Sequence, residues 1–222
     1  MNLLETRTLC QLPILQDALD DLYLWTQRNY MLLNGGKCLT MTFARNPPLP
    51  PPLRINDTEQ VVVPRLKVLG LHIQSDLHWD KQVNGMAAKA GRKLFLLKRL
   101  KKFNLPQGDL VAIYIGYVRP ILEYAVPVWN SGLTKNKSDL LERLQKRACR
   151  AIMGNSYNGY SHALEHLGLS TLVTRREQLC LKFARSLLDS EFRDWLPPPR
   201  TQITGRVSRN SHRLNCPKRT ST

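Results

Sequence analysis

The sequence predicts an α+β protein in which helix predominates. Apolar residues recur at helical spacing from Asp80 onward, whereas short β-branched or alternating runs are confined to the residues before it. Hydrophobic residues make up 42% of the 222, which is enough to form a core over most of the length. We therefore expect a small antiparallel sheet with one helix over residues 1–79, a helical bundle over 80–199 and a disordered basic tail over 200–222.

The first segment begins with a helix predicted over residues 12–30, because its apolar residues follow a helical spacing and its acidic ones fall opposite. The apolar stripe consists of Leu12, Leu15, Leu19, Leu22 and Trp25. The Asn-Gly-Gly sequence at 34–36 indicates a turn, and a strand is expected over 37–45. The proline-rich run at 47–52 then predicts an extended connector.

Further strands are predicted on either side of a turn at Asn56 and Asp57. The run VLGLHI at 68–73 alternates, with Leu69, Leu71 and Ile73 on one face. This alternation predicts one continuous strand.

Helices are predicted over 80–102, 106–119, 138–153, 160–167 and 171–189. Asp80 and Ser138 are the expected N-caps of the first and third, Pro120 bends or breaks the second, and Gly154 ends the third. The first helix buries a stripe made of Val83, Met86, Ala87, Ala90, Leu94 and Leu97. On the third helix, the residues that face outward are Arg143, Lys146, Arg147 and Arg150.

The charge points to an acidic partner. The chain has 33 Lys and Arg against 17 Asp and Glu, a net charge of +16. Eight basic residues and one acidic residue fall between Asp80 and Lys102, a local excess of +7. Nucleic acid is the commonest partner of such a surface. The alternative is that the protein is basic and soluble without such a partner. Four aromatic residues near this region either stack on bases or fill the core, and we favour the core: Tyr114, Tyr117, Tyr124 and Trp129.

Three groups of possible catalytic or metal-binding side chains are present, but a structural role is preferred for each. Asp20 and Asp21 lie in the middle of a helix, where adjacent side chains diverge. The segment 76–80 holds two acids and a histidine, yet it also suits a helix cap. His162 and His166 flank an inverted zinc-protease pattern without an evident third ligand. We expect no metal site.

The cysteines and the apolar runs indicate the cellular compartment of the protein. No two of the five cysteines have C-x-x-C spacing, so a reducing interior is expected. The most apolar run, 110–129, contains Arg119, Glu123 and two prolines, which indicates a core helix rather than a membrane span. The expected location is intracellular, in the nucleus or the cytoplasm, without a membrane.

Six segments occur in a specific order. They are LQDALDDLYLWTQRNYMLLNGGKCLTMTF, VLGLHIQSDLHWDKQV, KLFLLKRL, YVRPILEYAVPVWNSGLTK, LERLQKRACRAIMG and ALEHLGLSTLVTRREQLCLKFA. In this order they resemble the end of the palm, the thumb and the C-terminal region of reverse transcriptases from LINE-type (non-LTR, jockey-like) retrotransposons. The resemblance implies an RNA-directed DNA polymerase as the parent activity.

The resemblance implies three roles. Lys37 matches a lysine near the leaving pyrophosphate, where it would donate a proton or neutralise charge; an ordinary surface lysine is the alternative. A hairpin would position the primer end through Val68, Leu69, Gly70 and Leu71. Thumb cations would hold the primer–template at Lys81, Lys89, Arg92, Lys93 and Arg99.

The resemblance also implies partners beyond this sequence. The family's catalytic aspartates include a Tyr/Phe-x-Asp-Asp hairpin, which this sequence lacks. We therefore expect an inactive fragment without a cofactor of its own, with Mg²⁺ needed by the complete polymerase. Its partners would be an RNA–DNA hybrid or a DNA or RNA duplex, together with the N-terminal palm and fingers. The alternatives are a non-catalytic nucleic-acid-binding protein derived from a mobile element, a helical protein–protein module that docks through the Val83 stripe, and a relic without function.

Overall fold

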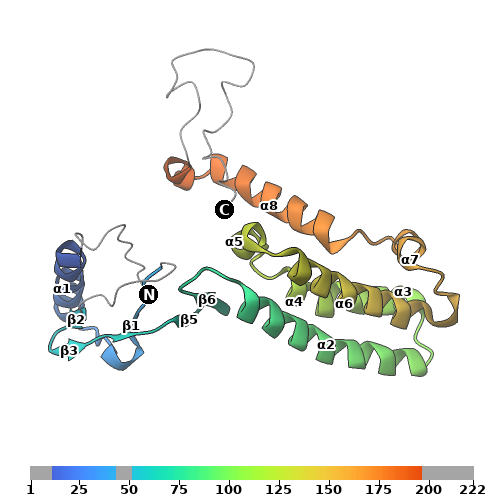
Figure 1. The fold of residues 1–222 in the computed structure, drawn as a ribbon, viewed down its shortest axis with the longest axis horizontal. Helices are drawn as coiled ribbons and strands as arrows, with labels where there is room; N and C mark the ends of the chain where they lie inside the picture. The colour runs from blue at the N-terminus through green and yellow to red at the C-terminus, as the bar shows by residue number, and fades with distance from the viewer. Residues whose placement is uncertain (1–11, 44–51, 197–222) are drawn as a thin grey trace, which may run out of the picture. The chain divides into compact units, whose positions relative to one another are not determined.

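The computed structural model describes residues 12–43 and 52–196 and confirms an α+β fold in which helices predominate (Figure 1). The predicted basic tail over 200–222 lies outside the described residues, as does most of the proline-rich connector. The chain divides into two compact units. Unit 1 holds the described residues up to Lys89 together with Gly132–Lys137, and unit 2 holds Ala90–Ser131 and the described residues from Ser138 onward. The division between residues 89 and 90 falls inside a helix.

Unit 1 begins with the predicted helix, α1 (Leu12–Arg28). The side chain of Gln16 fixes it to strand β2 (Arg54–Ile55): its Oε1 accepts from the backbone N–H of Arg54 at 2.9 Å and its Nε2 donates to the Arg54 carbonyl at 2.8 Å. Among the stripe positions whose side chains are described, Trp25 is wrong, because it is half exposed and Thr26 beside it is buried.

The strands of unit 1 do not form the one antiparallel sheet that the sequence predicts. They form three separate pairs. Strand β1 (Leu39–Thr40) is much shorter than predicted and runs parallel to β4 (Val61–Val62). Strand β2 pairs with β3 (Thr58–Glu59) across the predicted turn, where Asn56 has a φ of +52°. Each of these pairs is only two residues long, because glycines and prolines close to the strands limit the length of the ladders.

The run VLGLHI is a hairpin and not the single strand that its alternation predicts. Strand β5 (Arg65–Val68) pairs antiparallel with β6 (Leu71–Gln74), and Leu69 and Gly70 form the two-residue turn. Both turn residues have positive φ, +48° and +84°, as a two-residue hairpin turn requires. Each strand alternates with a period of two residues, and the turn between them is two residues long. The sequence therefore shows one unbroken alternation.

The hairpin is tied to the start of α2 (Asp80–Lys102), which has the predicted bounds. Gln74 Oε1 accepts from the Lys81 backbone N–H at 3.2 Å, and Gln82 Oε1 accepts from the His72 backbone N–H at 2.9 Å. Asp80 is the first helical residue rather than the cap, and its carboxylate pairs with Lys137 at 3.0 Å. Glutamine side chains from neighbouring elements therefore hold this helix end in place.

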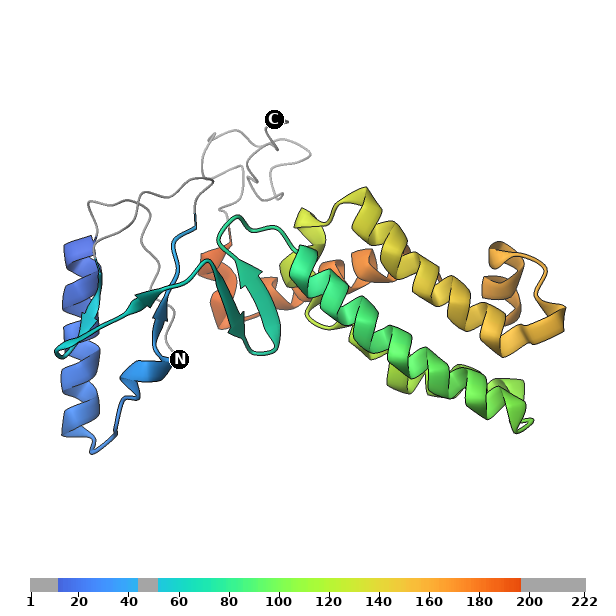
Figure 2. The same ribbon diagram turned by 60° about the horizontal axis from the view of Figure 1, so that its bottom comes forward.

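Unit 2 is a helical bundle. The α2 stripe is buried as predicted, except for the half-buried Ala87. Figure 2 shows the segment that follows running back beside α2, and α6 (Lys135–Met153) running next to it. Helix α7 (Tyr160–His166) and helix α8 (Leu172–Leu188) complete the bundle, and the Thr171 hydroxyl caps α8 by accepting from Thr174 N–H at 3.1 Å.

The returning segment does not break at Pro120. Helix α3 (Gln107–Ile113) leads into a π-helical turn (Tyr114–Val118) and then into α4 (Arg119–Glu123), with Pro120 in its first turn. The chain breaks instead at Ala125, whose φ of +51° separates α4 from α5 (Val126–Trp129). Pro120 lacks an N–H, and the wider π-turn before it accommodates the missing hydrogen bond.

The same segment meets a length and composition test for a membrane span, over Gln107–Gly132. Core helices of water-soluble proteins meet the same test. Here the residues at helical spacing along it are buried: Leu110, Tyr114, Val118, Leu122, Val126 and Trp129. Arg119 and Glu123 form an ion pair at 3.7 Å.

Helix α6 starts before the predicted cap. Ser138 lies inside its first turn, and the Ser138 hydroxyl accepts from Nη2 of Arg176 at 2.6 Å. Arg176 is itself buried on α8 and also donates to Asn130 Oδ1 at 3.1 Å, and burial lowers the pKa of its guanidinium. The helix ends at Gly154 as predicted, where φ is +61°.

Candidate nucleic-acid interface

One face of α2 carries the predicted cations. Lys81, Lys89, Arg92 and Arg99 are exposed, while the apolar stripe opposite them is buried. Arg92 and Arg99 are seven residues apart, which places them about 10 Å apart along the helix axis. Each strand of a duplex carries one phosphate per about 3.4 Å of axis, so the two guanidinium groups can reach phosphates about three nucleotides apart.

Lys93 differs from the other predicted cations because it is engaged within the chain. It is half-buried, donates to the Tyr117 hydroxyl and lies 4.2 Å from the centre of the Tyr117 ring. The cation–π contact fixes its ammonium group against the returning segment. Lys93 therefore contributes charge to the surface from a fixed position.

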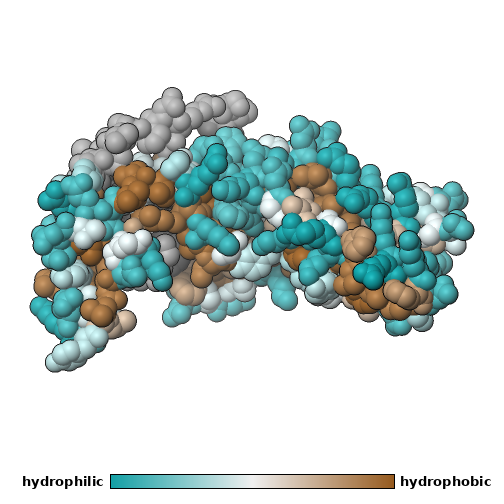
Figure 3. Space-filling view, turned by 90° about the horizontal axis from the view of Figure 1, so that it is seen from below, coloured by the Kyte–Doolittle hydropathy of each residue, from teal (hydrophilic) through white to brown (hydrophobic). Residues whose placement is uncertain are grey.

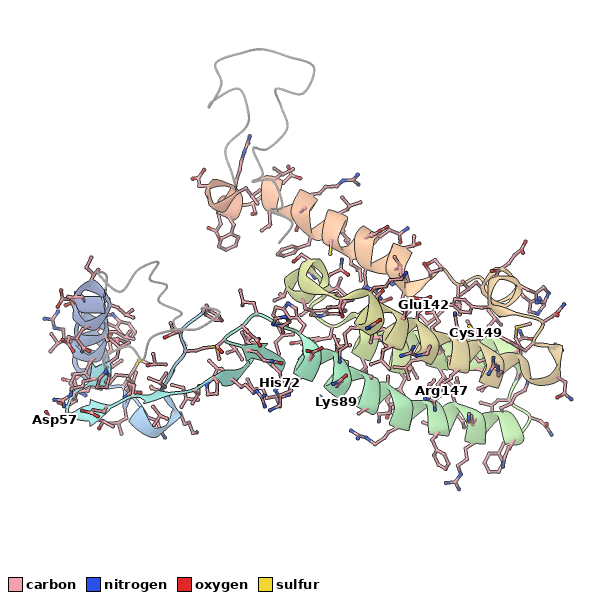
Figure 4. The ribbon with its side chains drawn as sticks, in the orientation of Figure 1. Asp57, His72, Lys89, Glu142, Arg147 and Cys149 are labelled. Atoms are coloured by element: carbon pink, nitrogen blue, oxygen red, sulfur yellow. The ribbon has the colours of Figure 1, made fainter. Side chains whose placement is uncertain are left out.

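Helix α6 adds a second row of cations that the sequence places outward but does not single out as a site. Arg143, Lys146, Arg147 and Arg150 are all exposed. Figure 4 labels Arg147 in this row, with Glu142 and Cys149 on the same helix. The signal that identifies the row is the repetition of cations at three- and four-residue intervals.

Aromatic rings of the following segment support this second row. Lys146 lies 5.0 Å from the ring centre of Tyr160, and Arg150 lies 5.0 Å from that of Tyr157. Among the described residues, none of the exposed arginines on α2 or α6 forms an ion pair with a carboxylate. Their charges are thus available to an external anion.

Apolar side chains interrupt the cations on α2. Phe95 and Leu96 are exposed, Phe95 at 64%. They lie three and four residues after Arg92, so they share its side of the helix. Figure 3 shows hydrophobic patches among the hydrophilic side chains of the face that it draws. A surface of this kind can contact phosphates and also the apolar edge of sugars or bases.

The predicted aromatic residues are divided between core and surface. Tyr114 and Trp129 are buried, and Trp129 donates its indole N–H to the Tyr124 carbonyl at 2.8 Å. Tyr117 and Tyr124 are partly exposed. The core interpretation therefore holds for two of the four.

Lys37 and the hairpin positions implied by the resemblance lie in unit 1. Lys37 is exposed at the end of a 3₁₀ turn (Gly35–Lys37), just before β1. The four hairpin positions form the tip: Val68 and Leu71 close the ladder, and Leu69 and Gly70 make the turn. Leu69 is 86% exposed, whereas Leu71 is buried. The tip thus presents backbone and one leucine side chain outward.

The possible metal ligands do not gather. Asp20 and Asp21 are exposed on α1, and Asp20 accepts a hydrogen bond from Gln16 at 2.8 Å. In residues 12–43 and 52–196 no group of three His, Cys, Asp or Glu side chains is placed to hold a metal ion. The donor set in this part of the chain therefore does not fit the paired Mg²⁺ ions of a polymerase.

The histidine candidates have local partners. His78 Nδ1 lies 3.3 Å from the Asp76 carboxylate, and Asp76 also accepts from the His78 backbone N–H at 2.9 Å, which lowers the Asp76 pKa. His162 and His166 stack on one another with ring centres 5.9 Å apart, and both are exposed. Each of these histidines thus has a partner within its own segment.

Comparisons with known proteins add no relative. A scan against protein-family models, a search of curated proteins and a search of solved structures each found no match.

Proposed function

We propose that this chain binds the phosphate backbone of a nucleic-acid duplex through the exposed cations of α2 and α6. We further propose that it does so as the primer–template-binding part of a LINE-type reverse transcriptase, with an RNA–DNA hybrid as its ligand. The chain would work inside the cell, in the nucleus or the cytoplasm. The sequence resemblance motivates the second step, and the surface chemistry supports the first.

The observation that carries the proposal is the two-sided character of α2. Its apolar stripe is buried and the opposite side presents lysine and arginine without carboxylate partners in the described part of the chain. A long helix with this arrangement can track a duplex backbone, since phosphate contacts fix position and depend on cations rather than on sequence.

Nucleotide addition is not proposed for this chain alone. The carboxylates that would hold Mg²⁺ in a polymerase are not gathered among the described residues. Under the proposal, they come from a palm region that precedes this sequence in the complete polymerase. Lys37 and the hairpin tip would then serve that assembled site, as positioning groups.

The test is the salt dependence of binding to a short RNA–DNA hybrid. Each phosphate contact contributes about 0.9 to the slope of log affinity against log salt concentration. The double variant R92Q/R99Q should reduce that slope by about 2 and weaken binding at about 50 mM salt. The control is K182Q/R185Q, which removes the same charge from exposed positions on α8. Equal loss in both variants, or no binding by the unaltered chain at about 50 mM salt, would contradict the proposal.

A second candidate is docking to another protein, favoured by the exposed apolar residues of α8. Leu181, Phe183 and Leu188 are all at least 40% exposed. The stripe that begins at Val83, which the sequence suggested for docking, is buried within the chain. Charge reversal at Lys89, Arg92 and Lys93 separates the two functions, because it abolishes nucleic-acid binding and leaves docking through α8 intact.

A further inference from the structure

The polar face of the β5–β6 hairpin carries a cluster of cations that lies apart from the hairpin tip. In an antiparallel pair, cross-strand neighbours share a face, and the register pairs Lys67 with His72 and Arg65 with Gln74. The opposite face holds the apolar side chains of Leu66, Val68, Leu71 and Ile73. The hairpin is therefore two-sided, like α2.

Lys67 and His72 are closely spaced. The His72 backbone N–H donates away from the ladder to Gln82 Oε1 at 2.9 Å. This direction is that of a non-hydrogen-bonded pair, in which opposing Cα atoms lie about 4.5 Å apart and the side chains are closest. The ammonium group of Lys67 and the imidazole of His72 thus share one small area.

Helix α2 brings further cations to the same face. The hydrogen bonds of Gln74 and Gln82 hold its first turn against β6. Lys81 lies in that turn, Lys89 lies about two turns further along the helix, and both are exposed. Figure 4 shows His72 on the strand that leads into α2 and Lys89 further along that helix. Burial, followed by the charges of Lys81, Lys67 and Lys89, lowers the pKa of His72.

Among the described residues, no ion pair joins these cations to a carboxylate. The acids nearest in sequence are Asp76 and Asp80. Asp76 pairs with His78 and also accepts from Gln74 Nε2 at 3.5 Å, and Asp80 pairs with Lys137. The charged groups that face His72 are thus Lys67 and Arg65 on the hairpin and Lys81 and Lys89 on α2. Such an arrangement is costly to leave unneutralised, and an anion with several charges would relieve it.

We propose that Lys67, His72, Lys81 and Lys89 form one phosphate-binding cluster that takes up a proton when a nucleic-acid strand binds. The proposal rests on the proposed function, and it adds a histidine and a pH dependence to it. A bound phosphodiester neutralises the lysines, so the imidazole accepts a proton from solvent and becomes a second donor to the phosphate. Binding should therefore strengthen as the pH falls.

The test measures the affinity of the full chain for a short RNA–DNA hybrid at about pH 7.5 and about pH 6, at constant salt. The unaltered chain should bind roughly threefold to tenfold more tightly at the lower pH. His72→Gln should lose most of this gain. His78→Gln is the matched control, because His78 is an exposed histidine of the same unit that pairs with Asp76, and it should keep the gain.

A second measurement follows the protonation of His72 itself. The His72 ring signals, followed by NMR against pH, should titrate at higher pH when the hybrid is saturating. In the free chain, Lys67→Gln should also raise the midpoint, whereas Lys98→Gln, further along α2, should not. An unchanged His72 midpoint in a chain that binds the hybrid would overturn this proposal alone. Absence of hybrid binding at both pH values and about 50 mM salt would overturn the proposed function as well. Equal competition by inorganic phosphate or phosphatidylserine vesicles would exclude nucleic acid as the source of the phosphate.

Discussion

The phenol of Tyr114 donates a 2.6 Å hydrogen bond to Gln145 Oε1, and both side chains are fully buried. Gln145 in turn donates to the Tyr160 hydroxyl at 3.0 Å and to the Ser170 carbonyl at 2.8 Å. Tyr160 donates to Glu142, which also accepts from the Leu172 N–H at 3.3 Å. This Gln145 network joins the returning segment, α6, α7 and the start of α8, and it fixes the row of cations on α6.

Removal of the Tyr114 hydroxyl should destabilise unit 2. In Tyr114→Phe, the ring remains and Gln145 Oε1 loses its donor inside the core. A buried acceptor without a partner costs about 1–3 kcal/mol. We expect the free energy of unfolding to fall by that amount in urea denaturation followed by far-ultraviolet circular dichroism. Tyr117→Phe is the control, because Tyr117 is partly exposed, and it should change stability by less than about 0.5 kcal/mol. Similar losses in the two variants would show that the network contributes little.

The ion pair between Glu123 and Arg175 should also stabilise the bundle. Arg175 binds both carboxylate oxygens of Glu123, with Nη2 at 2.8 Å from Oε2, and this contact raises the Arg175 pKa. Both side chains are at most 24% exposed. Glu123→Gln leaves Arg175 without its charged partner, and we expect a loss of about 1–3 kcal/mol in urea denaturation. Glu177→Gln, an exposed change on the same helix as Arg175, should be nearly neutral. A neutral Glu123→Gln would mean that water replaces the pair without cost.

Periodicity alone predicts much of this fold. Helix α2 has the predicted bounds because its apolar spacing is regular for about four turns and no proline interrupts it. The exposure of its cations follows from the same spacing. The end of α6 at Gly154 is equally local, since glycine adopts the left-handed conformation there without strain.

The remaining features depend on contacts between distant residues. Gln145 and Arg176 are buried at core positions of their helices, where the apolar pattern predicts hydrophobic residues. Their hydrogen-bond partners are up to 46 residues away in sequence. Pro120 reads as a helix break because no local rule specifies the π-turn that accommodates it. The His72 cluster requires the hairpin register and the position of α2 together, and neither is visible in a single sequence window.

The hairpin tip should tolerate, and benefit from, a residue suited to positive φ. Leu69 adopts φ +48°, a conformation that costs a branched, exposed leucine about 1 kcal/mol. Asparagine populates this region readily in two-residue turns. Leu69→Asn should raise the free energy of unfolding by about 0.5–1 kcal/mol in urea. Leu32→Asn, an equally exposed leucine without positive φ, should give no gain. If the tip positions a primer through its backbone, as proposed, hybrid binding by Leu69→Asn stays unchanged; weaker binding would assign that role to the leucine side chain.

Cys149 should be the least reactive of the described cysteines. It is fully buried, and burial raises the pKa of its thiol to about 11 from 9.0. The thiolate is the reactive form, so alkylation by iodoacetamide at about pH 8 should modify the half-exposed Cys38 and Cys180 first. Mass spectrometry of the digested chain gives the rate at each site, and in urea the three rates should converge.

The raised pKa of Cys149 also makes the stability of the fold depend on pH. The unfolded chain releases the Cys149 proton near pH 9.0 and the folded chain only near pH 11. The unfolded state therefore binds fewer protons between these values, so the stability contribution of the protonated thiol is complete below about pH 9 and is lost as the pH rises toward 11. Cys149→Ala should be less stable at neutral pH, because it removes a packed sulfur, but it should lose less stability than the unaltered chain as the pH rises from 9 toward 11. A parallel decline in both proteins would show that groups other than Cys149 control the alkaline response.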